Sequence, residues 1–179
     1  MSIAVIPGAA MRHRLFLALR PDGASCRQLT HLLQGESGLI PAANWHLTLR
    51  FLGSLDEVQF AALSEFLNGQ VFQGGEWRGT YLGPFPPGSH GRLVALQGDS
   101  PEWLQGLINQ LDAGLSRLGL GARDRAFLPH VSLLHRRDDL AWELGPDALR
   151  MQLRQMVLYA SLQNDKGVYY TPLQTIRLI

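Results

Sequence analysis

Two histidines of this chain stand in matching tetrapeptides. The sequence His46, Leu47, Thr48, Leu49 recurs 84 positions later as His130, Val131, Ser132, Leu133. Because successive side chains of a strand point to opposite faces, each histidine shares a face with its hydroxyl residue, Thr48 or Ser132. Two such strands side by side would line a cleft with two imidazoles and two hydroxyls. These groups supply an acid, a base and neutral hydrogen-bond donors without a metal, which suits a phosphate ester.

A plainer interpretation is that both tetrapeptides are half-buried strands whose polar residues face water. Among the remaining histidines, His13, His31 and His90 have no comparable setting and are expected to be ordinary surface residues. His135 differs, because it closely follows the second tetrapeptide.

The segments that would carry the two motifs lie in different halves of the chain, at 45–52 and 127–134. Further strands are predicted at 14–19, 77–82, 92–96, 152–162 and 168–178. Helices are predicted after the turn at 21–23, from a capping box of Ser54 and Glu57 to about Leu67, and from Ser100 as N-cap to about Leu118. The turn-rich connection at 83–90 could form the rim of a cleft. This order of elements predicts an α+β fold with antiparallel sheets.

The chain has 179 residues, enough for one domain with a sizeable core. We expect a flexible tail at 1–11, which Pro7 and Gly8 interrupt and no positive segment precedes, followed by a single domain at 12–179. Cys26 is the single cysteine, which fits a reducing compartment and predicts a cytoplasmic protein. No apolar stretch approaches the roughly 20 residues that span a bilayer, so no membrane is expected among its partners.

Sixteen basic and fifteen acidic side chains leave a formal charge of +1, so no overall field draws the protein to nucleic acid. Any RNA partner would have to be bound locally. The cationic side chains are almost all arginines, which favour phosphate contacts. They cluster at Arg12 and Arg14, at Arg117, Arg123 and Arg125, and at Arg136 and Arg137.

The surroundings of both tetrapeptides carry a resemblance to a known family. Residues 44–53 (NWHLTLRFLG) and 127–133 (FLPHVSL) resemble the paired HxTx signatures of the two-histidine (2H) phosphoesterase superfamily. Specifically, they are similar to its LigT/ThpR-like RNA 2′,3′-cyclic phosphodiesterases, once called 2′-5′ RNA ligases. The likeness extends to 14–19, 158–161 and 170–173. It implies a bilobal, pseudo-symmetric α+β fold in which two antiparallel sheets face a central cleft, with helices outside.

The resemblance also implies an enzyme, a phosphoric diester hydrolase of RNA processing. It would open a terminal 2′,3′-cyclic phosphate to a 2′-phosphomonoester without metal or cofactor, and could reversibly join 2′-5′ RNA ends. By this resemblance His130 is the base, His46 the acid, and Thr48 and Ser132 donate to the phosphate. The expected partners are RNA ends, tRNA fragments among them, or small cyclic nucleotides, and the protein is expected to be a monomer.

Five further residues are expected to bind substrate. Arg50 shares a face with His46 and Thr48 by the period of two, so it is expected to meet phosphate. Phe51 and Phe127, which flank the motifs, would stack on a terminal base or else pack in the core. The last two candidates are His135 and Arg137.

His135 is a departure from the family pattern, in which an arginine commonly stands five positions after the second motif histidine. A guanidinium can hold phosphate by two hydrogen bonds and an imidazole by one. Either His135 acts as a weaker donor, or a neighbouring arginine takes its place. Because alternate residues of a strand share a face, Arg137 fits that role better than Arg136 if the strand continues.

Three alternatives remain open at this point. The chain could be a related phosphoesterase acting on a small cyclic nucleotide or on an ADP-ribose cyclic phosphate. It could be a non-catalytic module that binds RNA ends, although two intact histidines and two hydroxyls argue against this. A metal-dependent hydrolase is disfavoured, because no cluster of histidines with carboxylates is visible near either motif.

Overall fold

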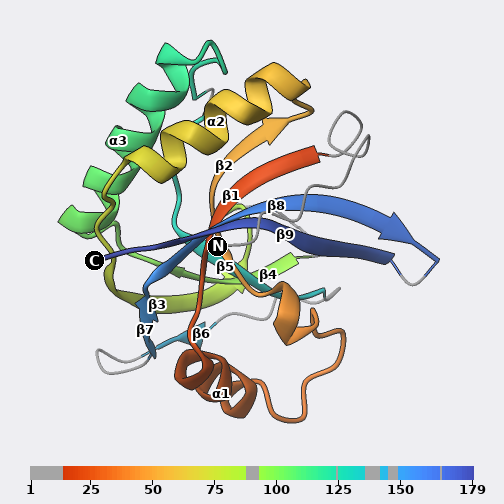
Figure 1. Cartoon of the computed structure of the whole chain (residues 1–179). Coiled ribbons are helices and arrows are strands. Elements are labelled where there is room, and N and C mark those ends of the chain that lie inside the picture. The colour runs from red at the N-terminus through yellow and green to blue at the C-terminus, as the bar shows by residue number, and fades with distance from the viewer. Residues whose placement is uncertain (1–13, 88–92, 124, 136–141, 145–148, 166) are drawn as a thin grey trace.

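The two motif strands lie next to each other in one curled antiparallel sheet (Figure 1). The structure is a computed structural model that describes residues 14–87, 93–123, 125–135, 142–144, 149–165 and 167–179. The expected tail at 1–11 and the candidate Arg137 lie outside these residues. Across the sheet the order is β6 (Trp142–Glu143), β3 (Gly75–Pro84), β4 (Leu93–Gly98), β5 (His130–His135), β2 (Leu47–Gly53), β1 (Arg14–Arg20), β8 (Gln155–Asn164) and β9 (Gly167–Arg177), and β7 (Leu149–Leu153) also pairs with β3.

Strands β2 and β5 join the two halves of this sheet. Their registered contact is the antiparallel pair of Leu47 and Val131. The predicted α+β class with antiparallel strands is therefore confirmed, and the strands expected in two sheets form one continuous curved sheet. Each half of the chain contributes one of these two strands, β2 from the first half and β5 from the second.

Strand β1 shows how the two faces of the sheet differ. Its residues Leu15, Leu17 and Leu19 belong to the main hydrophobic core, together with apolar residues of all three helices. Phe16 and Ala18 point to the other face, where they pack with Val157 and Tyr159 in a smaller cluster. We call this second face the site face, because His46 packs on it against Phe16.

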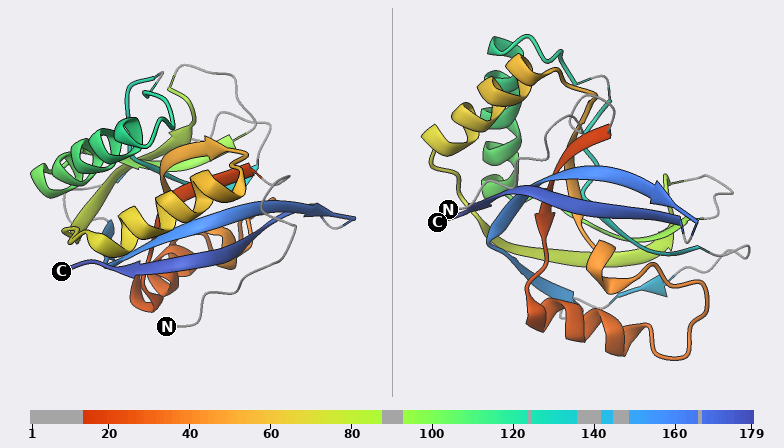
Figure 2. Two further views of the ribbon diagram at one scale, coloured as in Figure 1. Left: turned by 45° about the horizontal axis from the view of Figure 1, so that its top comes forward. Right: turned by 45° about the vertical axis from the view of Figure 1, so that its right-hand side comes forward.

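The helices lie outside the sheet (Figure 2) and are α1 (Gly23–Leu32), α2 (Glu57–Gly69) and α3 (Glu102–Arg117), with a short 3₁₀ helix at Ala42–Asn44. Helix α2 begins two residues later than predicted, so the capping box of Ser54 and Glu57 is wrong. The box is formed by Asp56, which accepts from the Gln59 N–H at 2.8 Å, while the Gln59 side chain accepts from the Asp56 N–H at 3.1 Å. Leu55, which lies between the predicted and the observed N-cap, is buried in the core.

Other predicted boundaries also shift, and the strand predicted at 45–52 begins at Leu47. Helix α3 has Pro101 as its N-cap, in place of Ser100. The predicted strand 127–134 begins at His130, and the predicted strand 152–162 is divided at Arg154 into β7 and β8. Among the described residues, no helix is both long and apolar enough to cross a membrane.

Candidate active site

The pairing of Leu47 with Val131 brings the two histidine motifs together. In an antiparallel pair, the residues that flank the paired positions lie across from one another in reverse order. His46 therefore lies across from Ser132, and Thr48 lies across from His130. Each imidazole has the hydroxyl of the other motif as its neighbour across the strands.

Both motif strands contain a β-bulge directly after the hydroxyl residue. On β2, Thr48 pairs with Ala18 and Arg50 with Leu17, so Leu49 is the extra residue. On β5, Ser132 pairs with Ala95 and Leu134 with Val94, so Leu133 is the extra residue. Burial follows the same sequence in 46–51 and 130–135, with two buried residues in succession before an exposed one. The two motifs thus share one backbone geometry.

The bulge on β2 corrects the expectation for Arg50. A regular strand would place Arg50 on the face of His46 and Thr48, but the extra residue reverses the alternation. Arg50 is only 8% exposed and lies on the core side, where its guanidinium donates to the Gly121 carbonyl at 3.1 Å and lies 3.9 Å from Asp112. Its polar contacts therefore lie on the core side of β2 and not on the face that carries His46 and Thr48.

The same reversal returns the next residue of each strand to the site face. Phe51 is 74% exposed, and its ring centroid is 5.9 Å from that of Phe16. His135 follows the buried Leu134 and is exposed. The candidates Phe51 and His135 are thus brought to the same face as the motif histidines.

Phe127 takes the core-packing alternative. Its ring packs against the main hydrophobic core, and the guanidinium carbon of Arg123 lies 5.5 Å from the ring centroid. The Arg123 guanidinium lies over one face of the Phe127 ring. The structure therefore does not bring Phe127 to the site as a surface on which a base could stack.

The two motif histidines make the same hydrogen bond. Nδ1 of His46 lies 2.6 Å from the Asn44 carbonyl oxygen, and Nδ1 of His130 lies 2.8 Å from the Leu128 carbonyl oxygen. A carbonyl oxygen only accepts, so Nδ1 carries the proton and donates it in both residues. In the neutral ring the free electron pair is then on Nε2, which is the nitrogen that can exchange a proton with a ligand.

Burial shifts both histidines toward the neutral form. It lowers the pKa of His46 below its ordinary value of 6.5, the hydrogen bond to Asn44 acts in the opposite direction, and the nearby His130 lowers the pKa further. Burial also lowers the pKa of His130, against the effect of its bond to Leu128. The effect of His130 on the pKa of His46 is expected for two imidazoles in one site.

Aromatic rings hold each imidazole in a different way. The His46 ring lies 5.0 Å from Phe16 and meets Tyr170 edge-on at 5.1 Å. The His130 ring is stacked on Phe85, with centroids 3.7 Å apart and planes inclined by 19°. Phe85 follows β3 directly and lies in the connection that was predicted to form a rim, although Phe85 itself was not a predicted site residue. The single signal for it was an aromatic residue between prolines in that loop.

The hairpin of β8 and β9 also reaches the site. The Asn44 side-chain amide donates to the Val168 carbonyl at 3.3 Å, and the Asn44 carbonyl is the acceptor for His46. Tyr159 and Tyr170 bring two further rings to the same cluster. In the described part of the chain, no group of three or more His, Cys, Asp and Glu side chains is arranged to hold a metal ion.

The chain is similar to known proteins over most of its length. No protein-family model matches the chain. An RNA 2′,3′-cyclic phosphodiesterase of Archaeoglobus fulgidus is 27% identical over 173 residues, which cover 90% of this chain and 98% of that protein. The structure of apo LigT from E. coli has a TM-score of 0.73 at 28% identity and covers 93% of this chain and 97% of its own.

Two further solved structures extend the comparison. LigT from E. coli in complex with 3′-AMP has a TM-score of 0.74 at 29% identity, over 93% of this chain and 98% of its own. A protein of Thermus thermophilus shares the fold, with a TM-score of 0.76 at 22% identity over 92% of this chain and 97% of its own.

The fold and the paired histidine motifs define a two-histidine phosphoesterase. The chain is similar to the LigT-like members of this superfamily over most of its length and is a phosphodiesterase.

Proposed function

We propose that the chain hydrolyses RNA 2′,3′-cyclic phosphate ends to 2′-phosphomonoesters. The observation that carries the proposal is the matched pair of imidazoles on neighbouring strands, each with Nδ1–H bound to a backbone carbonyl. This arrangement leaves two Nε2 atoms for proton transfer and one hydroxyl beside each of them. The names of the relatives point to the same substrate, since one is an RNA 2′,3′-cyclic phosphodiesterase and LigT binds 3′-AMP.

In the proposed reaction, water attacks phosphorus while the bond from phosphorus to the ribose 3′-oxygen breaks. His130 takes a proton from the water at Nε2, and the Leu128 carbonyl stabilises the imidazolium that forms. His46 starts as the imidazolium, with protons on both Nδ1 and Nε2, and gives its Nε2 proton to the departing 3′-oxygen, so the 3′-hydroxyl is released and the 2′-ester bond remains. The assignment of base and acid follows the family resemblance.

Thr48 and Ser132 are proposed to donate to the non-bridging oxygens of the phosphate. Each lies on the site face across from the histidine of the other motif, so charge that develops on phosphorus would be met by donors from both strands. Phe51 is proposed to stack on the base next to the cyclic phosphate, because its ring is exposed on the same face. If the 5′-hydroxyl of another RNA end attacked phosphorus in place of water, with the 3′-oxygen again departing, the same groups would join the two ends through a 2′-5′ bond.

The test is cleavage of a short RNA that ends in a 2′,3′-cyclic phosphate, in excess EDTA, with product isomers resolved. We expect wild type to release a 2′-phosphate end, and His46→Ala and His130→Ala each to lower kcat by about 100- to 10,000-fold. His31→Ala is the matched control, since this exposed histidine lies on α1. Loss of turnover in EDTA would refute the metal-free mechanism. Turnover of small cyclic nucleotides but not RNA would assign the site to that substrate class.

A further inference from the structure

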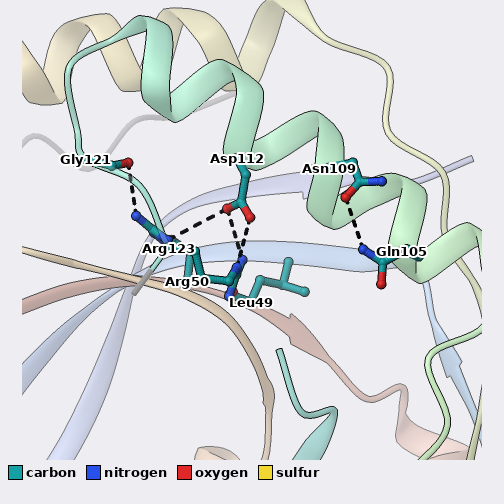
Figure 3. A network of polar contacts seen from close by, with 7 residues as sticks. All are labelled: Leu49, Arg50, Gln105, Asn109, Asp112, Gly121 and Arg123. Atoms are coloured by element: carbon teal, nitrogen blue, oxygen red, sulfur yellow. Dashed lines mark hydrogen bonds and ion pairs between the residues drawn. The ribbon is translucent and has the colours of Figure 1, made fainter. Parts of the chain in front are cut away.

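Three charged side chains connect β2 to the segment that leads into β5 (Figure 3). Asp112 on α3 binds Arg123 through two hydrogen bonds, from Nε at 2.9 Å and from Nη2 at 3.0 Å. Arg123 also donates from Nη1 to the Leu49 carbonyl at 3.0 Å. Arg50 completes the network through Asp112 and the Gly121 carbonyl. All of these contacts lie behind the site face.

The carbonyl that Arg123 binds belongs to the bulge residue of the first motif. The corresponding bulge residue of the second motif is Leu133, and its carbonyl accepts from the Ile40 N–H at 2.8 Å. Leu39 also forms a backbone bridge with Leu134. In β5 the bulge is therefore held by a neighbouring backbone, whereas in β2 a guanidinium supplies the donor.

Several contacts hold the Arg123 guanidinium in the position from which it donates to the Leu49 carbonyl. Two of its N–H groups donate to the Asp112 carboxylate, and its central carbon lies 5.5 Å from the centroid of the Phe127 ring. The Arg123 side chain is 20% exposed. An arginine has donors in a planar fork, so it can hold a carboxylate with one edge and reach a carbonyl with the other. A lysine could not make all three bonds in the same geometry.

We propose that Arg123, held by Asp112, is a positioning residue that keeps the bulge at Leu49 and thereby keeps Phe51 on the site face. Without the bulge, regular alternation would turn Phe51 toward the core side and Arg50 toward the site. Arg123 would then set substrate affinity without touching substrate. The kinetic part of this inference rests on the proposed function, in which Phe51 contacts the base.

The kinetic test compares Arg123→Gln, Arg123→Lys and Asn109→Ala on the RNA substrate. We expect Arg123→Gln to raise KM about tenfold with kcat within about threefold, and Arg123→Lys to give an intermediate KM. Asn109→Ala is the control, because Asn109 lies on the same helix and accepts from Gln105 at 3.0 Å outside the network (Figure 3). Its KM should equal that of wild type.

A double variant tests whether Arg123 acts through Phe51. If it does, Arg123→Gln combined with Phe51→Ala should have the KM of Phe51→Ala alone, because the ring is already absent. Independent, multiplied increases in KM would overturn the proposal. An unchanged KM with a lowered Tm would also overturn it, since the network would then serve stability alone.

Amide hydrogen exchange followed by NMR tests the bulge without any substrate. Arg123→Gln should speed exchange of the amides of 49–52 at least tenfold and leave those of Val131 and Leu133 unchanged. Equal exchange in 49–52 before and after the substitution would refute the role of Arg123. If wild type does not cleave RNA, the proposed function fails, and this measurement still decides the role of Arg123.

Discussion

Phe51 and His135 occupy corresponding positions in the two motif strands. Each stands five residues after its motif histidine, and in each strand a bulge residue, Leu49 or Leu133, brings this position back to the site face. One strand thus presents an exposed apolar ring and the other a polar ring. This difference gives the site two unlike ends, which suits a substrate with a base at one end and a phosphate at the other.

Replacing His135 by Arg tests the phosphate end. A guanidinium offers two parallel hydrogen bonds and a permanent charge, so His135→Arg should lower KM about tenfold with little change in kcat. Steady-state kinetics on the cyclic-phosphate RNA at low ionic strength would measure this. His31→Arg, on the exposed surface of α1, is the control for a general charge effect. An equal fall in KM for both variants would contradict the assignment.

The pH dependence of kcat/KM follows from the lowered pKa of both motif histidines. If one imidazole must be neutral and the other protonated, the profile is bell-shaped and both limbs report the free enzyme. Because burial lowers both pKa values below 6.5, we expect the maximum below pH 6.5 and a fall above it. Rates from pH 4.5 to 9 with constant ionic strength would locate it. A maximum above pH 7.5 would rule out these environments for the acid and base.

Phe85 should influence the acidic limb through His130. Its ring is stacked on the imidazole at 3.7 Å and contributes to the burial of that ring. Phe85→Ala would admit water, raise the pKa of His130 toward 6.5 and move the limb that His130 controls to higher pH. NMR titration of the histidine ring protons would show the same shift directly. Phe51→Ala is the comparison, and it should raise KM while leaving both limbs in place.

Thr48→Val tests the hydroxyl beside His130. Valine has the same branched shape and keeps the strand, so the variant removes one donor and little else. We expect kcat to fall about 100-fold with KM within threefold, because the donor serves charge that develops in the transition state. Thr30→Val on α1 is the matched control, since this exposed hydroxyl lies outside both motifs and donates to the Cys26 carbonyl within its own helix. A rise in KM alone would assign Thr48 to ground-state binding.

Much of the site could be predicted from local pattern. Alternation along a strand places His46 with Thr48 and His130 with Ser132, and this part of the prediction depends on nearest neighbours alone. The same rule gave the wrong face for Arg50, because it assumes an unbroken strand. Whether a bulge forms depends on the register of the adjacent strand, β1 for β2 and β4 for β5.

The sequence by itself determined the repeated motif, the antiparallel α+β class and the residues that are proposed to carry acid and base chemistry. The tertiary structure decided how they meet: the pairing of Leu47 with Val131, the carbonyls that hold each Nδ1, and the stacking of Phe85 on His130. Side-chain periodicity is a property of the local backbone, so it can be read along the chain. Partners dozens of residues apart are selected by packing of the whole sheet and its helices, and local pattern does not contain that information.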